Sequence, residues 1–387
     1  MFDSSLLLAL YSYMQIYKYR GCYLMDEFDL WPKKGDTQAQ DIDSPWYCND
    51  ATEDSQIISS RVRLARNIQQ INFSHKLTAD IAEEVVGKVK DAVDSINQEA
   101  QPFFKQAYST STTKVIRDQL LLEEHILSPK YLETEIPKTC YTSPDKGLSF
   151  MVNEEDHIRI QSIMPGRDIQ YALTSANILD DMLEQHLDFA FDPELGYLTS
   201  CPTNVGTGLR ASFLIHLPCL DKTELLKKLF PYISKAGMTL RGIYGEGTIS
   251  MGNIFQLSNQ VTLGLSEEEI IENLENVATN IIKRENETMD KIMETRQEYL
   301  KDKAYRAYGI LSFCRRISVK EAMHLLSDIR LGFYANVLDM EKPKKTIYQL
   351  MIEIQPGHMH NLQGGFLEEE HTDIARADYL RKIFKDT

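Results

Sequence analysis

Residues 197–212 read Tyr-Leu-Thr-Ser-Cys-Pro-Thr-Asn-Val-Gly-Thr-Gly-Leu-Arg-Ala-Ser, and they bring together a thiol, a flexible turn and a cation. Cys201 precedes a proline, Gly206 and Gly208 form the turn, and Arg210 follows. After Arg210 the pattern is that of a strand, because positions 213, 215 and 217 alternate with 214 and 216. A cysteine, a flexible backbone and a cation indicate a loop that meets an anionic ligand.

The composition is that of an ordinary globular protein. Of its 387 residues 43% are hydrophobic and 26% are charged, so the chain can bury a large core in one or two domains. The formal net charge of −15 argues against nucleic acid or an anionic membrane as a general partner. An anion site must therefore come from arginines that cluster locally. The six cysteines include no C-x-x-C pair, which argues against disulfides and zinc and favours the reducing cytoplasm.

The first 45 residues are predicted to form an irregular N-terminal extension. The apolar run from Leu6 to Tyr17 has no basic residue before it and is too short and too interrupted for a signal peptide or a membrane span. Met25 is an alternative start of the protein. The acidic stretch that follows it contains several structure breakers, among them Pro32 and Pro45.

Two polar segments predict parts of a binding site. If residues 59–63 are extended, Arg61 and Arg63 project from one face, and two forked cations on one face suit a polyphosphate. A solvated charged strand is the alternative. In the segment 147–161, alternation predicts a second polar face, with a charged edge strand as the alternative; this face comprises Glu155, His157, Arg159 and Gln161.

Hydrophobic periodicity predicts an α+β fold in two parts. Helices are expected over 78–100, 120–127, 177–191 and 221–232, and a strand over 254–263. Capping-box spacing opens two further helices at Ser266 and Ser318, and helical segments follow at 347–354 and 368–385. Strand patterns end near residue 285. We therefore predict a first domain over residues 46–285 and an all-helical domain over residues 286–387.

Familiar nucleotide motifs are missing from the sequence. It contains no P-loop and no protein-kinase signature, and the Gly206-x-Gly208-x-x-Ala211 pattern leads into a strand instead of the helix that a dinucleotide site requires. His358 and His360 lack a partnered acid at ligand spacing and are expected to be structural. Residues 240–248 predict a mobile glycine-rich loop with Glu246 at its tip. Arginines, two carboxylates and a thiol together indicate phosphoryl transfer to a cationic acceptor.

Four segments, in this order, resemble motifs of the phosphagen (guanidino) kinase family, and more closely its bacterial branch, the protein arginine kinases. They are Ser59-Ser-Arg-Val-Arg-Leu-Ala-Arg-Asn67, Asn153-Glu-Glu-Asp-His-Ile-Arg159, Cys201-Pro-Thr-Asn-Val-Gly-Thr-Gly-Leu-Arg210 and Arg241-Gly-Ile-Tyr-Gly-Glu246. The resemblance runs from about Trp46 to the C-terminus. It implies a mostly antiparallel sheet flanked by helices, ATP with Mg²⁺ as the nucleotide, and a guanidinium nitrogen as the phosphoryl acceptor.

The resemblance also implies roles for individual residues. Glu155 and Glu246 would bind and orient the guanidinium group, with Cys201 beside it. No protein side chain is expected to bind the metal directly. The implied nucleotide site consists of Ser59, Ser60, Arg61, Val62, Arg63, His125, Arg159, Arg210, Ala211, Ser212, Phe213, Leu214, Arg241, Gly242, Ile243, Tyr244, Gly245 and Glu246.

The chemistry agrees with these roles. A free guanidinium has a pKa above about 12, so one nitrogen must lose a proton as it attacks the γ-phosphorus. Glu155 is our first choice for the base that accepts this proton. Arginines and Mg²⁺ offset the charge of the transition state. Cys201 is expected to orient the acceptor as a thiolate, not to form a covalent intermediate.

The position of the extra domain favours arginine in proteins over free arginine as the acceptor. Only 60 residues precede Arg61, whereas small-molecule members of the family carry there a helical domain that helps to enclose the substrate. The extra domain here is C-terminal, as in the protein arginine kinases, where it mediates dimerisation and recognises phosphoarginine. We therefore expect a dimeric protein arginine kinase that marks proteins for a Clp-type unfoldase and protease, with a small zinc-binding activator as a partner. A free-arginine kinase and an inactive adaptor are the alternatives.

One motif departs from the family pattern. The phosphoarginine-binding motif reads Arg-Asp-x-x-Arg-Ala in the family, whereas this chain has Thr372-Asp373-Ile-Ala-Arg376-Ala377. The loss of the first arginine removes a bidentate partner for phosphate. We therefore predict that activation by phosphoarginine is weak or absent.

Overall fold

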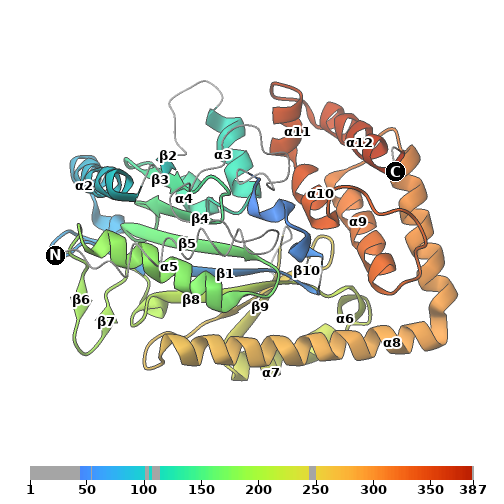
Figure 1. Cartoon of the computed structure of the whole chain (residues 1–387), viewed down its shortest axis with the longest axis horizontal. Coiled ribbons are helices and arrows are strands. Elements are labelled where there is room, and N and C mark those ends of the chain that lie inside the picture. Colours follow the sequence, from blue (N-terminus) through green and yellow to red (C-terminus); the bar gives the residue numbers. More distant parts are fainter. Residues whose placement is uncertain (1–43, 54, 101–103, 107–113, 244–249, 386–387) are drawn as a thin grey trace, which may run out of the picture.

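The structure is a computed structural model that describes residues 44–53, 55–100, 104–106, 114–243 and 250–385. The predicted N-terminal extension up to residue 43, with the alternative start Met25, lies outside the described residues. A central sheet lies between layers of helices, and the C-terminal helices stand at one end of it (Figure 1).

An antiparallel sheet forms the centre of the molecule. Its eight strands follow the order β2-β3-β4-β5-β1-β8-β10-β9, and each neighbouring pair is antiparallel. β6 (Phe191–Asp192) and β7 (Gly196–Tyr197) pair separately. The strands of the large sheet are β1 (Ile57–Arg66), β2 (Lys105–Gln106), β3 (Thr139–Thr142), β4 (Leu148–Val152), β5 (Ile158–Pro165), β8 (Leu209–His216), β9 (Met238–Gly242) and β10 (Ile254–Asn259). The α+β class and the antiparallel sheet are as predicted.

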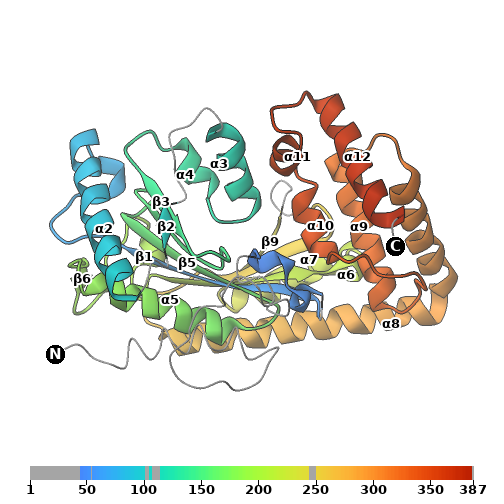
Figure 2. The same cartoon turned by 45° about the horizontal axis from the view of Figure 1, so that its top comes forward.

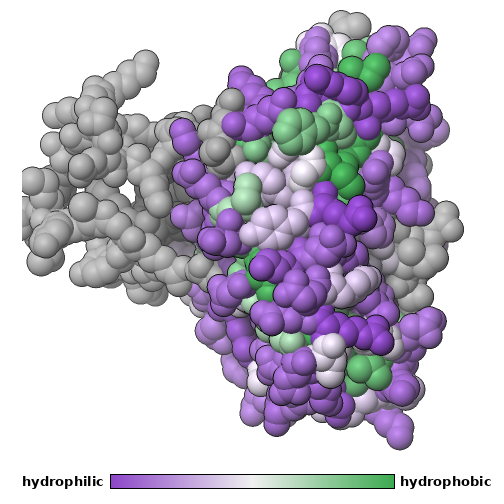
Figure 3. All heavy atoms as spheres, turned by 90° about the vertical axis from the view of Figure 1, so that its right-hand side faces the viewer, coloured by the Kyte–Doolittle hydropathy of each residue, from purple (hydrophilic) through white to green (hydrophobic). Residues whose placement is uncertain are grey.

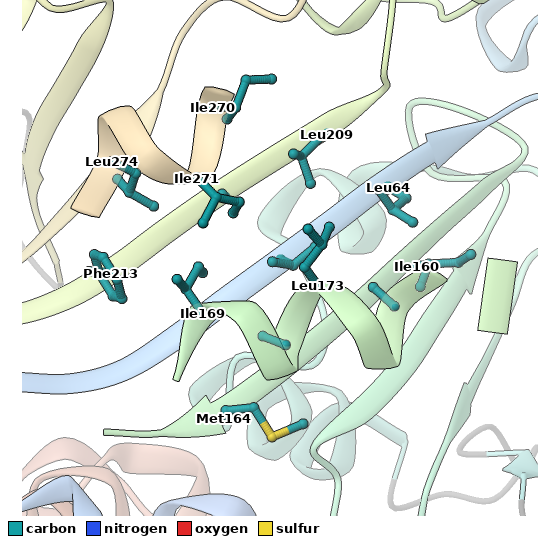
Figure 4. Close-up of a cluster of buried hydrophobic side chains, with 14 of the residues drawn as sticks. Leu64, Ile160, Met164, Ile169, Leu173, Leu209, Phe213, Ile270, Ile271 and Leu274 are labelled. Atoms are coloured by element: carbon teal, nitrogen blue, oxygen red, sulfur yellow. The ribbon is translucent and has the colours of Figure 1, made fainter. Parts of the chain in front are cut away.

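One face of the sheet is apolar and packs on helices. These are α2 (Ala79–Ala100), α5 (Ile169–Glu184), α7 (Leu225–Lys235) and the first part of α8 (Glu267–Phe313). In the close-up, Ile169 and Leu173 of α5 and Ile271 of α8 point towards strand residues such as Leu64 and Phe213 (Figure 4). Each of these side chains is almost fully buried, which contributes about 1.5–3 kcal/mol apiece. This burial fixes which strand residues face away from the helices.

The opposite face is covered only in part. Figure 2 shows α5 and α8 on one side of the sheet and α3 (Lys114–Glu123) and α4 (Pro129–Glu133) on the other. A small apolar cluster, which includes Leu121 and Met151, holds α3 and α4 onto the edge of this second face. The middle of the second face therefore remains for polar side chains.

The C-terminal helices share a core with the sheet. α8 extends over 47 residues with one non-helical residue at Arg296, so it crosses the predicted boundary at residues 285 and 286 without a break. Beyond it lie α9 (Val319–Tyr334), α10 (Ile347–Glu353), α11 (Pro356–Leu362) and α12 (Glu369–Lys385). Their buried side chains pack with Trp46 and with Ile58, Ile163 and Leu214 of the sheet.

Some predicted elements are confirmed and others have different bounds. The capping box of Ser266 with Glu269 is formed, and Ser318 caps α9. The segment 120–127 is wrong as one helix, because α3 ends at Glu123 and Pro129 begins α4. The prediction over 177–191 began too late and ended too late, since α5 spans 169–184. The segment 221–232 falls into α6 (Pro218–Lys222) and α7.

The strand predicted over 254–263 is too long, and its end has a physical cause. The side chain of Asn259 accepts a hydrogen bond from the backbone NH of Ala211 and donates one to the carbonyl of Leu209. These two groups would otherwise pair with the next residues of β10, so the ladder ends at Asn259. Within the described ranges, no helix combines the length and apolar character needed to cross a membrane.

Candidate active site

Five arginines lie on the second, polar face of the sheet, which we call the arginine face. Residues that pair across antiparallel strands have side chains on the same face. Arg63 of β1 pairs with Arg210 of β8 and with Gln161 of β5, and Ala65 pairs with Arg159. Arg61 and Arg241 belong to the same face by the same alternation. The predicted common face of Arg61 and Arg63 is therefore confirmed, and the register adds the other three.

The arginine face gathers like charges that repel one another. Burial lowers the pKa of Arg63 well below its ordinary value, and the charges of Arg61, Arg159 and Arg210 lower it further. The buried Nε of Arg63 has no hydrogen-bond partner among the described residues. Burial also lowers the pKa of Arg210, with the charges of Arg159 and Arg241 in the same direction. An anion placed here would relieve the repulsion and satisfy the guanidinium groups.

Glu154 is the acid that the arginine face holds most closely. Its Oε1 lies 2.7 Å from Nη1 of Arg159, and it accepts a hydrogen bond from Ser128. Burial alone would raise the pKa of Glu154, but Arg159, Ser128 and the backbone NH of Glu155 outweigh burial and lower it. Glu154 is therefore a fixed anion that orients Arg159. The sequence offered it only as part of the Asn153–Arg159 segment.

A narrow pocket that is partly open to solvent adjoins the arginine face. It unites residues from distant segments, including six that had been predicted to bind the nucleotide: Ser59, Arg61, His125, Ser212, Leu214 and Ile243. Trp46, Ile163 and Gln256 complete its lining, and the sequence had not pointed to these three. An apolar wall of Trp46 and Ile163 beside arginines suits a flat ring joined to phosphates.

His125 is held in an unusual backbone conformation in this cavity. Its φ of 64° is left-handed, which a non-glycine residue adopts at a cost of about 1–3 kcal/mol. Nε2 of His125 lies 3.1 Å from the hydroxyl of Tyr348 in α10, and Trp46 packs on both rings. Burial lowers the pKa of His125 to about 3, and the charge of Arg61 adds to the shift. The imidazole is therefore neutral near pH 7.

The predicted polar strand face at 155–161 is wrong in its first half. Residues 153–157 form a bend, and β5 begins only at Ile158. His157 points away from the arginines: its Nδ1 accepts a hydrogen bond from the backbone NH of Ile68, and its Nε2 lies 2.8 Å from the carbonyl of Asn72. It is a buried structural histidine. Burial lowers its pKa.

Glu155 remains at the arginine face despite the bend. Its side chain is 30% exposed and pairs with Lys130, whose Nζ lies 3.0 Å from Oε1. Glu155 and Cys201 both lie close enough to Arg210 to oppose the lowering of its pKa. The structure therefore brings an acid and a thiol to one end of the arginine face, and Glu155 is the better exposed of its two acids.

Cys201 stands at the start of a short turn. Its Sγ lies 3.0 Å from Oγ1 of Thr203, and the turn η4 (Pro202–Asn204) follows directly. The predicted glycine-rich backbone is required here, because Gly208 has a φ of 68° and a Cβ on it would lie 2.7 Å from the carbonyl of Ala65. The chain passes too close to β1 for any side chain at this position.

Several predicted residues do not present side chains to the site. The alternation of the strands puts Ser60, Val62, Ala211 and Phe213 on the opposite face, where they are buried. Any contact that they make with a nucleotide is therefore limited to their backbone. Gly242 ends β9 beside Arg241. Tyr244, Gly245 and Glu246 lie outside the described residues.

The C-terminal motif is built into the core of the helical region. Arg376 donates hydrogen bonds to the carbonyls of Ile354 and Ile317 and to the carboxylate of Asp373. Thr372 is buried and donates to the carbonyl of Glu368 within α12. Ala377 is fully buried. The residues of the predicted phosphoarginine motif are thus buried and bind other parts of the helical region.

The two C-terminal histidines both contact other side chains of the protein. Nδ1 of His358 lies 2.9 Å from Oε2 of Glu123, and His360 packs on Phe366. Across the part of the chain that the structure describes, no three His, Cys, Asp or Glu side chains are arranged to hold a metal ion.

Comparison with known proteins identifies the class. Residues 84–288 match the model of the ATP:guanido phosphotransferase C-terminal catalytic domain, which together with the arginine face places the chain in the ATP:guanido phosphotransferase family. The chain belongs to that family. Residues 297–387 match a second model, the protein-arginine kinase McsB C-terminal domain. The resemblance seen in the sequence motifs is confirmed.

Relatives with about 40% sequence identity to this chain are protein-arginine kinases. The protein-arginine kinase of Geobacillus stearothermophilus is 41% identical over 340 residues, which cover 88% of this chain and 93% of the relative. The protein-arginine kinase of Bacillus subtilis is 40% identical over 344 residues, or 89% and 94% of the two chains.

Solved structures agree on the fold alone. Lombricine kinase has a TM-score of 0.52 at 22% identity and covers 63% of this chain and 69% of its own. A duplicated taurocyamine kinase from Schistosoma mansoni has a TM-score of 0.53 at 24% identity, over 73% of this chain and 40% of its own.

Proposed function

We propose that the protein is an ATP-dependent protein arginine kinase, which transfers the γ-phosphate of ATP to the guanidinium group of arginine residues in proteins. The observation that carries the proposal is the arginine face, where like charges crowd together beside Glu155 and Cys201. In such a site the anionic phosphates would bind to the arginines, and the cationic acceptor would bind beside Glu155 and Cys201. The names of the matching family models and of the curated relatives support the same function.

The phosphates would lie along the arginine face. Arg61, Arg63 and Arg210 lie on adjacent strands, so their guanidinium groups can bind neighbouring phosphate oxygens. The cavity beside Trp46 and His125 would take the nucleoside. Mg²⁺, when bound with ATP, would neutralise charge on the phosphates.

The acceptor guanidinium would lie between Glu155 and Cys201. Glu155 would exchange its pairing with Lys130 for the incoming guanidinium and would receive the proton that the attacking nitrogen loses. A thiolate at Cys201 would hold the acceptor from the other side. Glu246 is proposed as the second carboxylate, on the basis of its motif alone.

The remaining predictions also become part of the proposal. We propose a catalytic unit over 46–285 and a helical unit over 286–387, a homodimer formed through the helical unit, and work in the cytoplasm with a zinc-binding activator and a Clp-type protease. Apolar side chains such as Ile310, Phe313 and Phe366 are exposed on the helical unit. The end of the molecule formed by these helices has a mainly hydrophilic surface with scattered apolar areas (Figure 3). Arg376 and Thr372 favour weak activation by phosphoarginine, because neither is presented to solvent.

The test is mass spectrometry of an arginine-rich protein after incubation with the enzyme, ATP and Mg²⁺, under neutral handling that preserves phosphoramidates. We expect phosphate on arginine, and a rate about 1,000-fold lower for Glu155→Gln, because the amide cannot accept the proton. Binding of a fluorescent ATP analogue should be the same for both proteins. Phosphorylation of free arginine in place of protein would contradict the proposed acceptor. ATP binding without any transfer of phosphate would contradict the proposal that the protein is an active kinase.

A further inference from the structure

The chain that follows β1 connects two parts of the acceptor site. Asn67 is buried, and its side-chain amide makes three hydrogen bonds. Nδ2 donates to Oδ1 of Asp156 at 2.7 Å and to the carbonyl of Leu198 at 3.0 Å, while Oδ1 accepts from the backbone NH of His157 at 2.9 Å. One side chain therefore holds both the bend that carries Glu155 and the segment that leads to Cys201.

Asp156 completes the connection from the other side. The same Oδ1 that accepts from Asn67 also accepts the backbone NH of Ser200, at 2.6 Å. Asp156 is 2% exposed and follows Glu155 directly, and Ser200 directly precedes Cys201. A single buried oxygen thus joins the neighbours of the two groups that would grip the guanidinium.

Arg66 fastens the same segment at both of its ends. Its guanidinium lies 3.4 Å from the ring centre of Tyr197, and its Nη1 donates to the carbonyl of Thr207 at 3.1 Å. Nη2 is fixed by Asp180 at 2.6 Å. The Cys201 segment is therefore held at residues 197 and 207 by Arg66 and at residues 198 and 200 by Asn67 and Asp156.

We infer that Asp156 is a positioning residue for the acceptor, which acts through hydrogen bonds that set the separation of Glu155 and Cys201. The inference rests on the proposed function of these two residues. Arg66 and Asn67 directly continue the strand that carries Arg61 and Arg63. The same strand thereby fixes the acceptor groups relative to the phosphate-binding arginines, as in-line transfer requires.

The first experiment separates the hydrogen bonds of Asp156 from its charge. Asp156→Asn keeps a carbonyl oxygen that can accept from both Asn67 and Ser200, whereas Asp156→Leu removes the acceptor that these two donors share. For transfer to an arginine-containing peptide, we expect Asp156→Asn to keep kcat/KM within about threefold and Asp156→Leu to lower it about 100-fold, since a small misplacement of reacting groups has an effect of this size. The dissociation constant of a fluorescent ATP analogue should change less than about threefold in both.

A second experiment exchanges the two side chains. Asn67→Asp places two carboxylates side by side and removes the amide that donates to Asp156. When Asp156→Asn is added in the same chain, position 156 supplies the donor and position 67 the acceptor. We expect the double variant to recover at least about tenfold of the activity that Asn67→Asp loses. The alkylation rate of Cys201, measured with Cys22, Cys48 and Cys314 changed to serine, should change in Asp156→Leu and return to its normal value in Asp156→Asn.

Each result decides a separate question. If Asp156→Asn is as inactive as Asp156→Leu, the charge of Asp156 is what matters and the inference is overturned. It is also overturned if ATP binding and acceptor use decline together in Asp156→Leu, or if the double variant recovers nothing. If the unaltered enzyme phosphorylates no arginine, the proposed function fails first, whatever the variants do.

Discussion

Arg63 is a half-buried cationic side chain and Arg376 an almost fully buried one, and their surroundings are opposite. Arg63 has three arginines near it and a buried Nε without a partner among the described residues. Arg376 donates to two backbone carbonyls, and its Nη1 lies 2.6 Å from a carboxylate oxygen of Asp373. Burial lowers the pKa of both, but Asp373 opposes the shift at Arg376, whereas like charges increase it at Arg63.

The difference shows how a structural arginine can be told from one that awaits a ligand. A folded chain stabilises its own buried cations with acceptors, as around Arg376 and around Arg66 with Asp180. Where cations are gathered without sufficient acceptors, the missing negative charge has to come from elsewhere. By this criterion we propose the arginine face as a ligand site, whereas Arg376 joins α12 to the ends of neighbouring helices.

The largest expected effect follows from the substitution Arg63→Met. We expect the rate of arginine phosphorylation to decrease about 1,000-fold, in the range found for arginines that stabilise phosphoryl transfer. The free energy of unfolding, from urea titration, should stay the same or rise, because a buried like charge is removed. A clear loss of stability together with near-normal activity would show that Arg63 is structural and would erase the contrast with Arg376.

The reverse result is expected for Arg376→Met. The substitution leaves Asp373 and two carbonyls without their donor, so we expect the free energy of unfolding to decrease by about 3 kcal/mol. Arginine phosphorylation per folded molecule should remain within about threefold of normal. Arg306→Met is the matched control: that arginine pairs with Asp302 one turn earlier in α8 at the surface, and we expect a change below about 1 kcal/mol. An equally small effect at Arg376 would contradict its structural role.

A smaller effect concerns pH and sharpens the description of the arginine face. In the folded protein, burial and Arg61 lower the pKa of His125 to about 3, below its value of about 6.5 in the unfolded chain. The unfolded chain therefore takes up a proton first, and stability is lost as the pH falls from about 6.5 towards 3. The slope from this one group is at most about 1.4 kcal/mol per pH unit.

Urea unfolding of the unaltered protein and of His125→Asn at pH 7, 6 and 5 measures this contribution. His157 and His216 also have lowered pKa values, so only the difference between the two proteins reports on His125. We expect the stability of the variant to decline less steeply with acid. If the free energy of unfolding declines equally with acid in both proteins, His125 titrates normally and the arginines do not suppress its charge.

The sequence predicted the arrangement of side chains correctly where similar residues recur at every second position of a strand. Alternation put Arg61 and Arg63 on one face, and the glycine-rich segment around Gly208 was read as a close turn; both agree with the structure. Alternation misled at His157, because the bend at 153–157 has no periodicity of its own and follows from the tertiary hydrogen bonds of Asn67 and Asp156. Trp46 and Tyr348 meet at His125 over more than 200 positions of chain, and no local pattern contains such a contact.

The contact of Tyr348 with His125 also bears on how this protein could be divided or recombined. Tyr348 comes from α10, and Glu123 of α3 accepts hydrogen bonds from the backbone of Gly357 and His358 in α11. The wall of the pocket beside the arginine face is thus braced by helices that match a separate family model. A chimaera that joins this catalytic unit to a relative's helical unit would have to preserve these contacts of Tyr348, Gly357 and His358.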